Sequence, residues 1–347
     1  TVVFANEPMV RVQGPLLQAQ LIESLILNAV NFQTLIATKA ARICEAAAPG
    51  DVLEFGLRRA QGESGAMAAS RAAYIGGCAA TSNLLAGKRY GIPVRGTHAH
   101  SWVLTHKSEL EAFDSYAQAM PNNCILLVDT FDTLTGVKHA IEVGRRMQER
   151  GHQLLGIRLD SGDLTALSIA ARTMLDEAGL DHVKIVASND LDEHEIRSLK
   201  QRGAAIDLWG VGTRLATAYD QPALGGVYKL SALRDAEGVW QPKIKLSEQA
   251  VKISTPGVLQ TRRYRRRGQF VSDIIFDEMG GIDQPVQVVD TTGQSHRLPL
   301  DAVGEDLLVP IYRDGNLVYD NPPPVVLRRH AEKQRQLFEA LGQRRGK

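Results

Sequence analysis

Short apolar runs recur along the first two thirds of the chain, and segments of helical periodicity separate most of them. The runs lie at residues 52–55, 76–80, 92–96, 124–128, 154–159, 183–187 and 206–211, with 226–230 as a candidate eighth. The intervening helices are predicted at residues 64–74, 108–120, 134–150, 163–178 and 191–202. Gly151, Gly179 and Gly203 are expected to end the last three. Regular alternation of strands and helices predicts a parallel sheet with crossover helices.

Seven or eight strand–helix rounds favour a closed barrel over an open doubly wound sheet. A dinucleotide-binding fold is disfavoured, because no Gly-x-Gly-x-x-Gly turn follows the first run at 52–55. We therefore expect an α/β barrel over residues 49–232.

The two ends of the chain have different patterns. Residues 15–47 repeat apolar positions every three or four residues, which predicts a long helix packed on the core or on a subunit interface. Beyond residue 232, predicted strands at 243–246, 251–253, 274–276 and 286–289 indicate a β-rich domain. We expect residues 233–322 to form this domain together with residues 1–48. Residues 322–324 are a rigid proline linker, and a charged helix is predicted within 323–347.

The composition and charge of the chain mainly argue against certain classes of partner. A net charge of +1 over 347 residues gives no electrostatic reason to expect nucleic acid or a membrane surface as partner. The dense basic run at 262–267 is expected to be a solvated strand or turn. Three scattered cysteines are typical of reduced thiols in a cytoplasm, and no run of eighteen apolar residues exists. The first residues look like a strand already under way, so we expect a processed or truncated beginning.

Polar residues with functional chemistry follow most of the apolar runs. Because the carboxyl ends of barrel strands meet at one face, we expect these residues to lie together. In chain order they are Phe55 and Arg58, Thr81 to Asn83, Thr97, His98 and His100, Asp129, Arg158 and Asp160, Ser188, and Gly212 with Thr213.

Each of these groups has a chemical rationale and a structural alternative. Arg58 suits a carboxylate or phosphate, although a surface salt bridge is an equal alternative. Asp129 beside a histidine would fix the tautomer of that ring. The open turn at 210–213 suits a phosphate, although glycine pairs also serve tight turns. The set predicts a site for a phosphorylated sugar and a small aromatic acid.

A metal-dependent barrel hydrolase is an alternative, because His98 and His100 at a strand end are able to ligate zinc. A barrel that serves assembly only, without catalysis, is a further alternative.

Several longer motifs resemble nicotinate phosphoribosyltransferase, in order and over nearly the whole chain. They are EFGLRRAQG at 54–62, GTHAHSW at 96–102, RLDSGDL at 158–164 and GVGT at 210–213, with further likeness at 5–15, 31–43 and 245–257. The resemblance implies a type II phosphoribosyltransferase with an irregular TIM-like α/β barrel and a smaller α/β sandwich domain built from both chain ends. It also implies transfer of phosphoribose from phosphoribosyl pyrophosphate to nicotinate in NAD salvage, which yields nicotinate mononucleotide and pyrophosphate. The resemblance further implies ATP as co-substrate, Mg²⁺, a homodimer and a cytoplasmic location.

The resemblance also assigns roles to individual residues. His100 corresponds to the phosphorylated histidine, and Asp129 to its partner. The expected substrate contacts are Thr97, Arg158 and the stacking ring of Phe55 for nicotinate, Asp160 near the ribose and the ring, Arg58 near the pyridine and phosphates, and Thr213 for the donor. The family's N-terminal tyrosine that stacks on the pyridine has no counterpart in this sequence.

Nicotinamide phosphoribosyltransferase is the nearest competing function. That enzyme uses an aspartate in the stretch that corresponds to residues 80–84, where it accepts hydrogen bonds from the amide. Here the stretch contains no carboxylate that would repel nicotinate, so the acid substrate is favoured.

Overall fold

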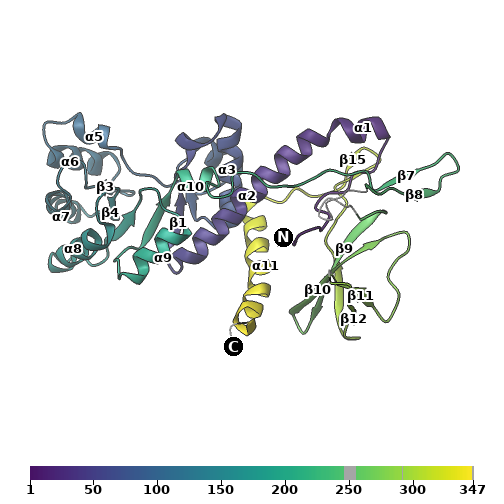
Figure 1. Ribbon diagram of the computed structural model, residues 1–347. Coiled ribbons are helices and arrows are strands. Elements are labelled where there is room, and N and C mark those ends of the chain that lie inside the picture. The colour runs from purple at the N-terminus through teal and green to yellow at the C-terminus, as the bar shows by residue number, and fades with distance from the viewer. Residues whose placement is uncertain (246–254, 291, 346–347) are drawn as a thin grey trace. The chain divides into compact units, whose positions relative to one another are not determined.

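The computed structural model describes residues 1–245, 255–290 and 292–345 and divides into two compact units (Figure 1). One unit consists of Thr1–Ala29, Gly225–Pro322 and His330–Lys347, and the other of Val30–Leu224 and Pro323–Arg329. The strand predicted at 251–253 lies outside the described residues.

The second unit is built on a six-stranded parallel sheet in the order β2-β1-β6-β5-β4-β3. The strands are β1 (Asp51–Glu54), β2 (Ala80–Thr81), β3 (Ile125–Leu127), β4 (Gly156–Leu159), β5 (Lys184–Ala187) and β6 (Leu208–Val211). Strands that follow one another in sequence pair side by side, except that β2 and β3 do not pair with each other. The last strand, β6, also pairs with β1. This is the strand order of a barrel that is open between β2 and β3. The predicted α/β fold class is confirmed.

The predicted count of seven or eight strands is wrong for the described residues. The run at 92–96 contributes only an isolated bridge between Thr81 and Val94. Pro93 has no N–H to donate to a ladder, which explains why this run does not form a full strand. The run at 226–230 forms no strand and lies in the other unit.

Helices cover this sheet as the periodicity predicts. They are α3 (Gly62–Gly76), α4 (Leu84–Tyr90), α5 (His100–Leu104), α6 (Glu109–Ala119), α7 (Thr133–Glu149), α8 (Leu164–Glu177), α9 (Glu193–Gln201) and α10 (Thr213–Ala216), with the short 3₁₀ turn η1 (Leu57–Arg59). The side chains of Asn83, Asp132 and Asp163 accept backbone N–H groups at helix starts. Gly151, Gly179 and Gly203 follow α7, α8 and α9 at positive φ, so the predicted ends are confirmed.

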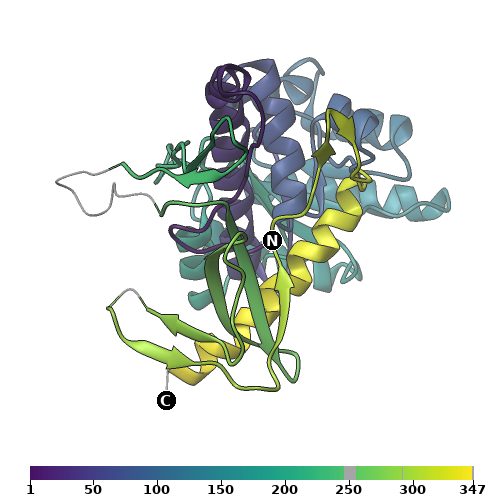
Figure 2. The same ribbon diagram turned by 90° about the vertical axis from the view of Figure 1, so that its right-hand side faces the viewer.

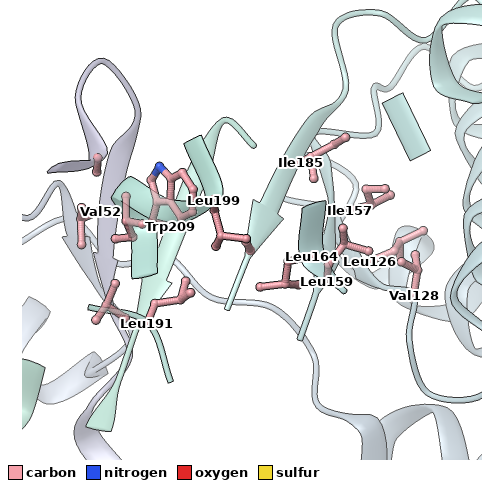
Figure 3. Packing of buried hydrophobic residues seen from close by; sticks show 14 of the residues in the cluster. Val52, Leu126, Val128, Ile157, Leu159, Leu164, Ile185, Leu191, Leu199 and Trp209 are labelled. Atoms are coloured by element: carbon pink, nitrogen blue, oxygen red, sulfur yellow. The ribbon is translucent and has the colours of Figure 1, made fainter. Parts of the chain in front are cut away.

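The core of this unit lies between the sheet and these helices. Strand side chains such as Leu126, Ile157 and Trp209 are almost fully buried (Figure 3). The predicted helix at 15–47 is two helices, α1 (Leu16–Leu21) and α2 (Glu23–Ala47). The apolar stripe of α2 is buried from Leu35 onward, whereas Leu25 and the leucines of α1 remain exposed.

The first unit is rich in antiparallel strands (Figure 2). Strands β9 (Leu259–Arg266), β10 (Gln269–Asp277) and β13 (Val303–Asp306) form one sheet in the order β10-β9-β13. Three hairpins join β7 (Ala232–Arg234) to β8 (Trp240–Pro242), β11 (Gln287–Val289) to β12 (Ser295–Arg297), and β14 (Tyr312–Arg313) to β15 (Asn316–Leu317). Helix α11 (Pro324–Arg345) begins within the proline linker.

The basic run is neutralised by carboxylates on the same sheet. Arg262 pairs with Asp306 at 2.6 Å, and Arg265 pairs with Glu305 at 2.9 Å. The run forms a strand as predicted, but the side chain of Arg263 is fully buried instead of solvated. In the part of the chain that the structure describes, no helix is long and apolar enough to cross a membrane.

Candidate active site

The guanidinium of Arg158, near the end of β4, joins residues from the ends of β1, β4 and β5 and from the segment that contains Thr97. Its Nε donates to Ser188 Oγ at 2.8 Å, Nη1 to Thr97 Oγ1 at 3.0 Å, and Nη2 to Asp160 Oδ1 at 2.8 Å. The group lies 5.4 Å from the centroid of the Phe55 ring, within the range of a cation–π contact. With 14% of the side chain exposed, the cation is fixed but remains accessible. The structure thus brings these five predicted site residues together.

Asp129 and His100 form a second cluster next to the first. Oδ1 of Asp129 lies 3.2 Å from His100 Nε2, while Oδ2 accepts the backbone N–H of Asp160 at 3.0 Å and the hydroxyl of Ser161 at 2.6 Å. The Asp129 side chain is 1% exposed, whereas the His100 side chain is 41% exposed. A buried carboxylate therefore holds a solvent-accessible imidazole, an arrangement that supports a nucleophilic or proton-transferring histidine. The contact to Asp160 connects the two clusters.

Ser188 lies inside the Arg158 cluster. Its hydroxyl accepts from Arg158, donates to the carboxylate of Asp160, and is almost fully buried. Ser188 therefore fixes the orientations of these two side chains.

The turn after β6 approaches the Phe55 ring closely. A Cβ added at Gly210 would lie 2.8 Å from two ring atoms, and one added at Gly212 would lie 3.3 Å from the Phe55 carbonyl oxygen. Glycine is thus required at 210 for the ring to lie where it does. Thr213 follows directly and is half-buried at the start of α10.

Arg214, the next residue, forms an ion pair with Asp192 at 2.5 Å. Burial raises the pKa of Asp192, but the backbone N–H of Glu195 and the Arg214 guanidinium outweigh it and lower the pKa overall. The loops after β5 and β6 are joined through this pair.

Arg58 is placed differently from the other predicted residues. It lies on η1 with an exposed side chain. Among the described residues, no hydrogen bond or ion pair joins it to the Arg158 cluster.

Glu54 is a structural residue of the site that is missing from the predicted set. Its buried carboxylate, at the end of β1, accepts from the Gly56 N–H, from Ser70 Oγ at 2.9 Å and from Thr81 Oγ1 at 2.6 Å. A glutamate within an apolar run is a usable signal, because a buried carboxylate requires several donors. Asn83 caps α4, because its side chain accepts the backbone N–H of Ala86.

The two histidines do not form a metal site. His98 Nε2 accepts the Leu127 N–H at 3.1 Å, and its Nδ1 lies 3.3 Å from the Ala99 carbonyl oxygen. Both ring nitrogens of His98 are therefore engaged, and no lone pair faces His100. Within the described ranges, no group of three or more histidine, cysteine, aspartate or glutamate residues could hold a metal ion. The zinc hydrolase alternative thus loses its ligand pair.

Fold and site together define an α/β-barrel protein whose candidate active site lies at the carboxyl ends of its strands. The model of the nicotinate phosphoribosyltransferase (NAPRTase) family matches residues 51–252, more than half of the chain. The chain belongs to the nicotinate phosphoribosyltransferase family, as the sequence motifs predict.

Individual relatives agree with this assignment. The chain is 46% identical to a nicotinate phosphoribosyltransferase of Bacillus subtilis over 328 residues, which are 92% of this chain and 66% of the relative. It is 42% identical to one of Mycobacterium tuberculosis, over 93% of this chain and 64% of the relative. The chain thus spans slightly less than two thirds of the length of these relatives.

Solved structures show the same fold. The human nicotinic acid phosphoribosyltransferase matches with a TM-score of 0.77 and 29% identity, over 92% of this chain and 71% of that one. A nicotinate-nucleotide pyrophosphorylase from Pyrococcus furiosus matches with a TM-score of 0.70 and 25% identity, over 91% and 73% of the two chains.

Proposed function

We propose that this protein transfers the phosphoribosyl group of phosphoribosyl pyrophosphate to nicotinate in NAD salvage, with ATP hydrolysis coupled to the reaction. The products are nicotinate mononucleotide and pyrophosphate. The observation that carries the proposal is the Arg158 cluster: a fixed, accessible guanidinium over an aromatic ring, with the Thr97 hydroxyl beside it. Family membership supports the same reaction.

The cluster suits a planar aromatic acid. The Arg158 guanidinium would bind the nicotinate carboxylate in place of its contacts to hydroxyl groups, and Phe55 would stack on the pyridine ring. Holding the ring nitrogen in line with the ribose C1 carbon lowers the entropic barrier to the displacement. At that carbon the bond to pyrophosphate breaks and the bond to the pyridine nitrogen forms.

His100 is the proposed phosphate acceptor from ATP. Its Nε2 faces Asp129, which leaves Nδ1 as the nitrogen with a free lone pair. Attack of Nδ1 on the γ-phosphorus forms an N–P bond and releases ADP, and the buried carboxylate stabilises the resulting positive ring. Hydrolysis of this phosphohistidine returns the free imidazole and inorganic phosphate.

The donor would lie over the turn of Gly212 and Thr213, with Asp160 near the ribose and Arg58 reaching the phosphates from η1. Mg²⁺ would neutralise the phosphate charge. Because the described residues contain no cluster of three acidic or histidine ligands, the ion fits best as one held mainly by phosphate oxygens and water.

A homodimer in the cytoplasm completes the proposal. Leu17, Leu21 and Leu25 are exposed apolar residues, which supports an interface on α1 and the start of α2. The three cysteines are reduced thiols, which supports a reducing compartment.

Product analysis with nicotinate and nicotinamide supplied separately, with and without ATP, tests the function. We expect pyrophosphate release and mononucleotide formation with nicotinate, and stimulation by ATP. Equal use of nicotinamide would overturn the substrate assignment. In His100→Ala the ATP stimulation should disappear, and unchanged ATPase activity in that variant would overturn the phosphohistidine role.

A further inference from the structure

The opening of the barrel between β2 and β3 is filled by the segment from Pro93 to His98. On the β2 side, the N–H of Thr81 donates to Pro93 O and the N–H of Arg95 donates to Thr81 O, both at 3.0 Å. On the β3 side, the Leu127 N–H donates at 3.1 Å to the imidazole Nε2 of His98. A side-chain nitrogen thus takes the place of the backbone carbonyl that a neighbouring strand would supply.

The contacts of His98 determine its protonation state. Because Nε2 accepts a hydrogen bond, the neutral ring carries its proton on Nδ1, 3.3 Å from the Ala99 carbonyl oxygen. The ring is buried edge-on to Tyr116, with centroids 4.8 Å apart. Burial, followed by the nearby charges of Arg158 and His100, lowers the pKa of His98 to about 4, although the hydrogen bond to Ala99 opposes this shift.

The same residue anchors both clusters of the candidate active site. Its backbone carbonyl accepts the Thr97 hydroxyl at 3.0 Å, and that hydroxyl in turn accepts from Arg158. Two residues further along, His100 contacts Asp129. Movement of the His98 ring away from β3 would therefore displace Thr97 and His100 together.

We propose that His98 is a positioning residue, whose neutral imidazole closes the open edge of the barrel at Leu127 and thereby holds Thr97 and His100 in register. The consequences for catalysis rest on the proposed function, whereas the consequences for the Leu127 amide do not.

Two variants separate hydrogen bonding from packing. His98→Gln keeps an acceptor near the position of Nε2, and His98→Phe keeps a ring but removes the acceptor. In His98→Phe we expect faster exchange of the Leu127 amide hydrogen, by about tenfold to a hundredfold, because an unsatisfied buried donor favours opening. The KM for nicotinate should rise and phosphorylation of His100 should fall in the same variant. His98→Gln should restore most of each property.

His106→Phe is the matched control. His98 and His106 flank helix α5, but His106 contacts Trp102 instead of the barrel edge. It should leave the Leu127 exchange rate and the KM unchanged. Leu127 protection and KM at wild-type values in His98→Phe would overturn the proposal. If the wild type itself fails to use nicotinate, the proposed function fails, and the exchange measurements still decide the role of His98.

Nitrogen-15 spectra of the wild-type imidazole provide a test that requires no variant to fold. We expect an unprotonated Nε2 and a protonated Nδ1 from pH 8 down to about pH 5, set by the lowered pKa. The opposite tautomer, or protonation of the ring near its ordinary pKa, would overturn the proposal.

Discussion

Two strand arginines, Arg158 in the barrel unit and Arg263 in the β-rich unit, have similar surroundings but differ in how accessible they are. Each pairs with an aspartate and lies over a phenylalanine ring, at 5.4 Å from Phe55 and 5.7 Å from Phe270. Arg263 is fully buried, whereas Arg158 retains 14% exposure.

Their hydrogen-bond partners explain the difference. Arg263 makes two bonds to the Asp273 carboxylate, at 2.8 and 2.5 Å, and further bonds to Gln334 Oε1 and the Val2 carbonyl. Arg158 has one carboxylate partner and two hydroxyl partners. A ligand carboxylate can replace a hydroxyl at small cost, but it cannot replace a bidentate carboxylate inside a sealed site. The comparison teaches that a fixed but incompletely neutralised cation indicates a binding site. A cation whose hydrogen bonds are all satisfied by the protein has a structural role.

The largest expected effect is on stability, at Arg263. Arg263→Met leaves Asp273 buried without its partner, and should lower the free energy of unfolding by about 3–5 kcal/mol. Denaturant unfolding measures this change. Arg262→Met, which removes a partly exposed pair on the same strand, is the control and should cost less than about 1 kcal/mol. Equal costs for the two variants would contradict a structural role specific to Arg263.

The next effect is on activity, at Arg158. Arg158→Met removes the proposed carboxylate contact and should lower kcat/KM for nicotinate by about 30- to 5,000-fold, the range of 2–5 kcal/mol for a charge-paired contact. Steady-state kinetics at varied nicotinate measures it. A decrease of less than threefold would show that Arg158 does not bind the substrate.

A smaller effect concerns pH and the carboxylates beside Arg263. Burial, followed by the hydrogen bond and charge of Asp273, raises the pKa of Glu7 to about 7. Because the folded state binds this proton more tightly, stability declines as pH rises from the ordinary glutamate pKa of 4.5 to the raised pKa of about 7, and is level above that. Glu7→Gln should remove this decline, on the order of 1–2 kcal/mol because Glu7 is only partly buried. If the stability of Glu7→Gln and of the wild type depends on pH in the same way across this range, Glu7 does not have this role.

The smallest effect is expected at a hydroxyl partner of Arg158. Ser188→Ala removes one fixing contact and should raise the KM for nicotinate about three- to tenfold, corresponding to roughly 1 kcal/mol. Ser168→Ala is the matched control, since Ser168 is equally buried but bonds to Thr165 and Ala205. An equal rise in KM for both variants would indicate a general packing effect.

Much of the fold was predictable because local physics determines it. The strands are continuous apolar runs such as 124–128, and the helix ends carry aspartate or asparagine caps and glycines at positive φ. The third predicted strand failed because Pro93 lacks the donor that a ladder needs.

The site was predictable in its composition but not in its contacts. Position at strand ends correctly indicated that Thr97, Arg158 and Ser188 lie together. The role of the His98 ring depends on a hydrogen bond to Leu127, 29 residues away, and no local pattern encodes such pairing. The position of Arg58 after the first apolar run and its motif predict a place in the cluster, but the short turn η1 directs its side chain to the exposed surface.

The Asp192 carboxylate has a mechanical consequence. One oxygen accepts the backbone N–H groups of His194 and Glu195 at the start of α9, and the other binds Arg214 on α10. The loops after β5 and β6 are therefore held together by one carboxylate and cannot move independently. Displacement of the 212–213 turn would therefore shift the first backbone amides of α9, which Asp192 caps. Binding of a ligand at the 212–213 turn should thus change the environment of the Glu195 backbone amide.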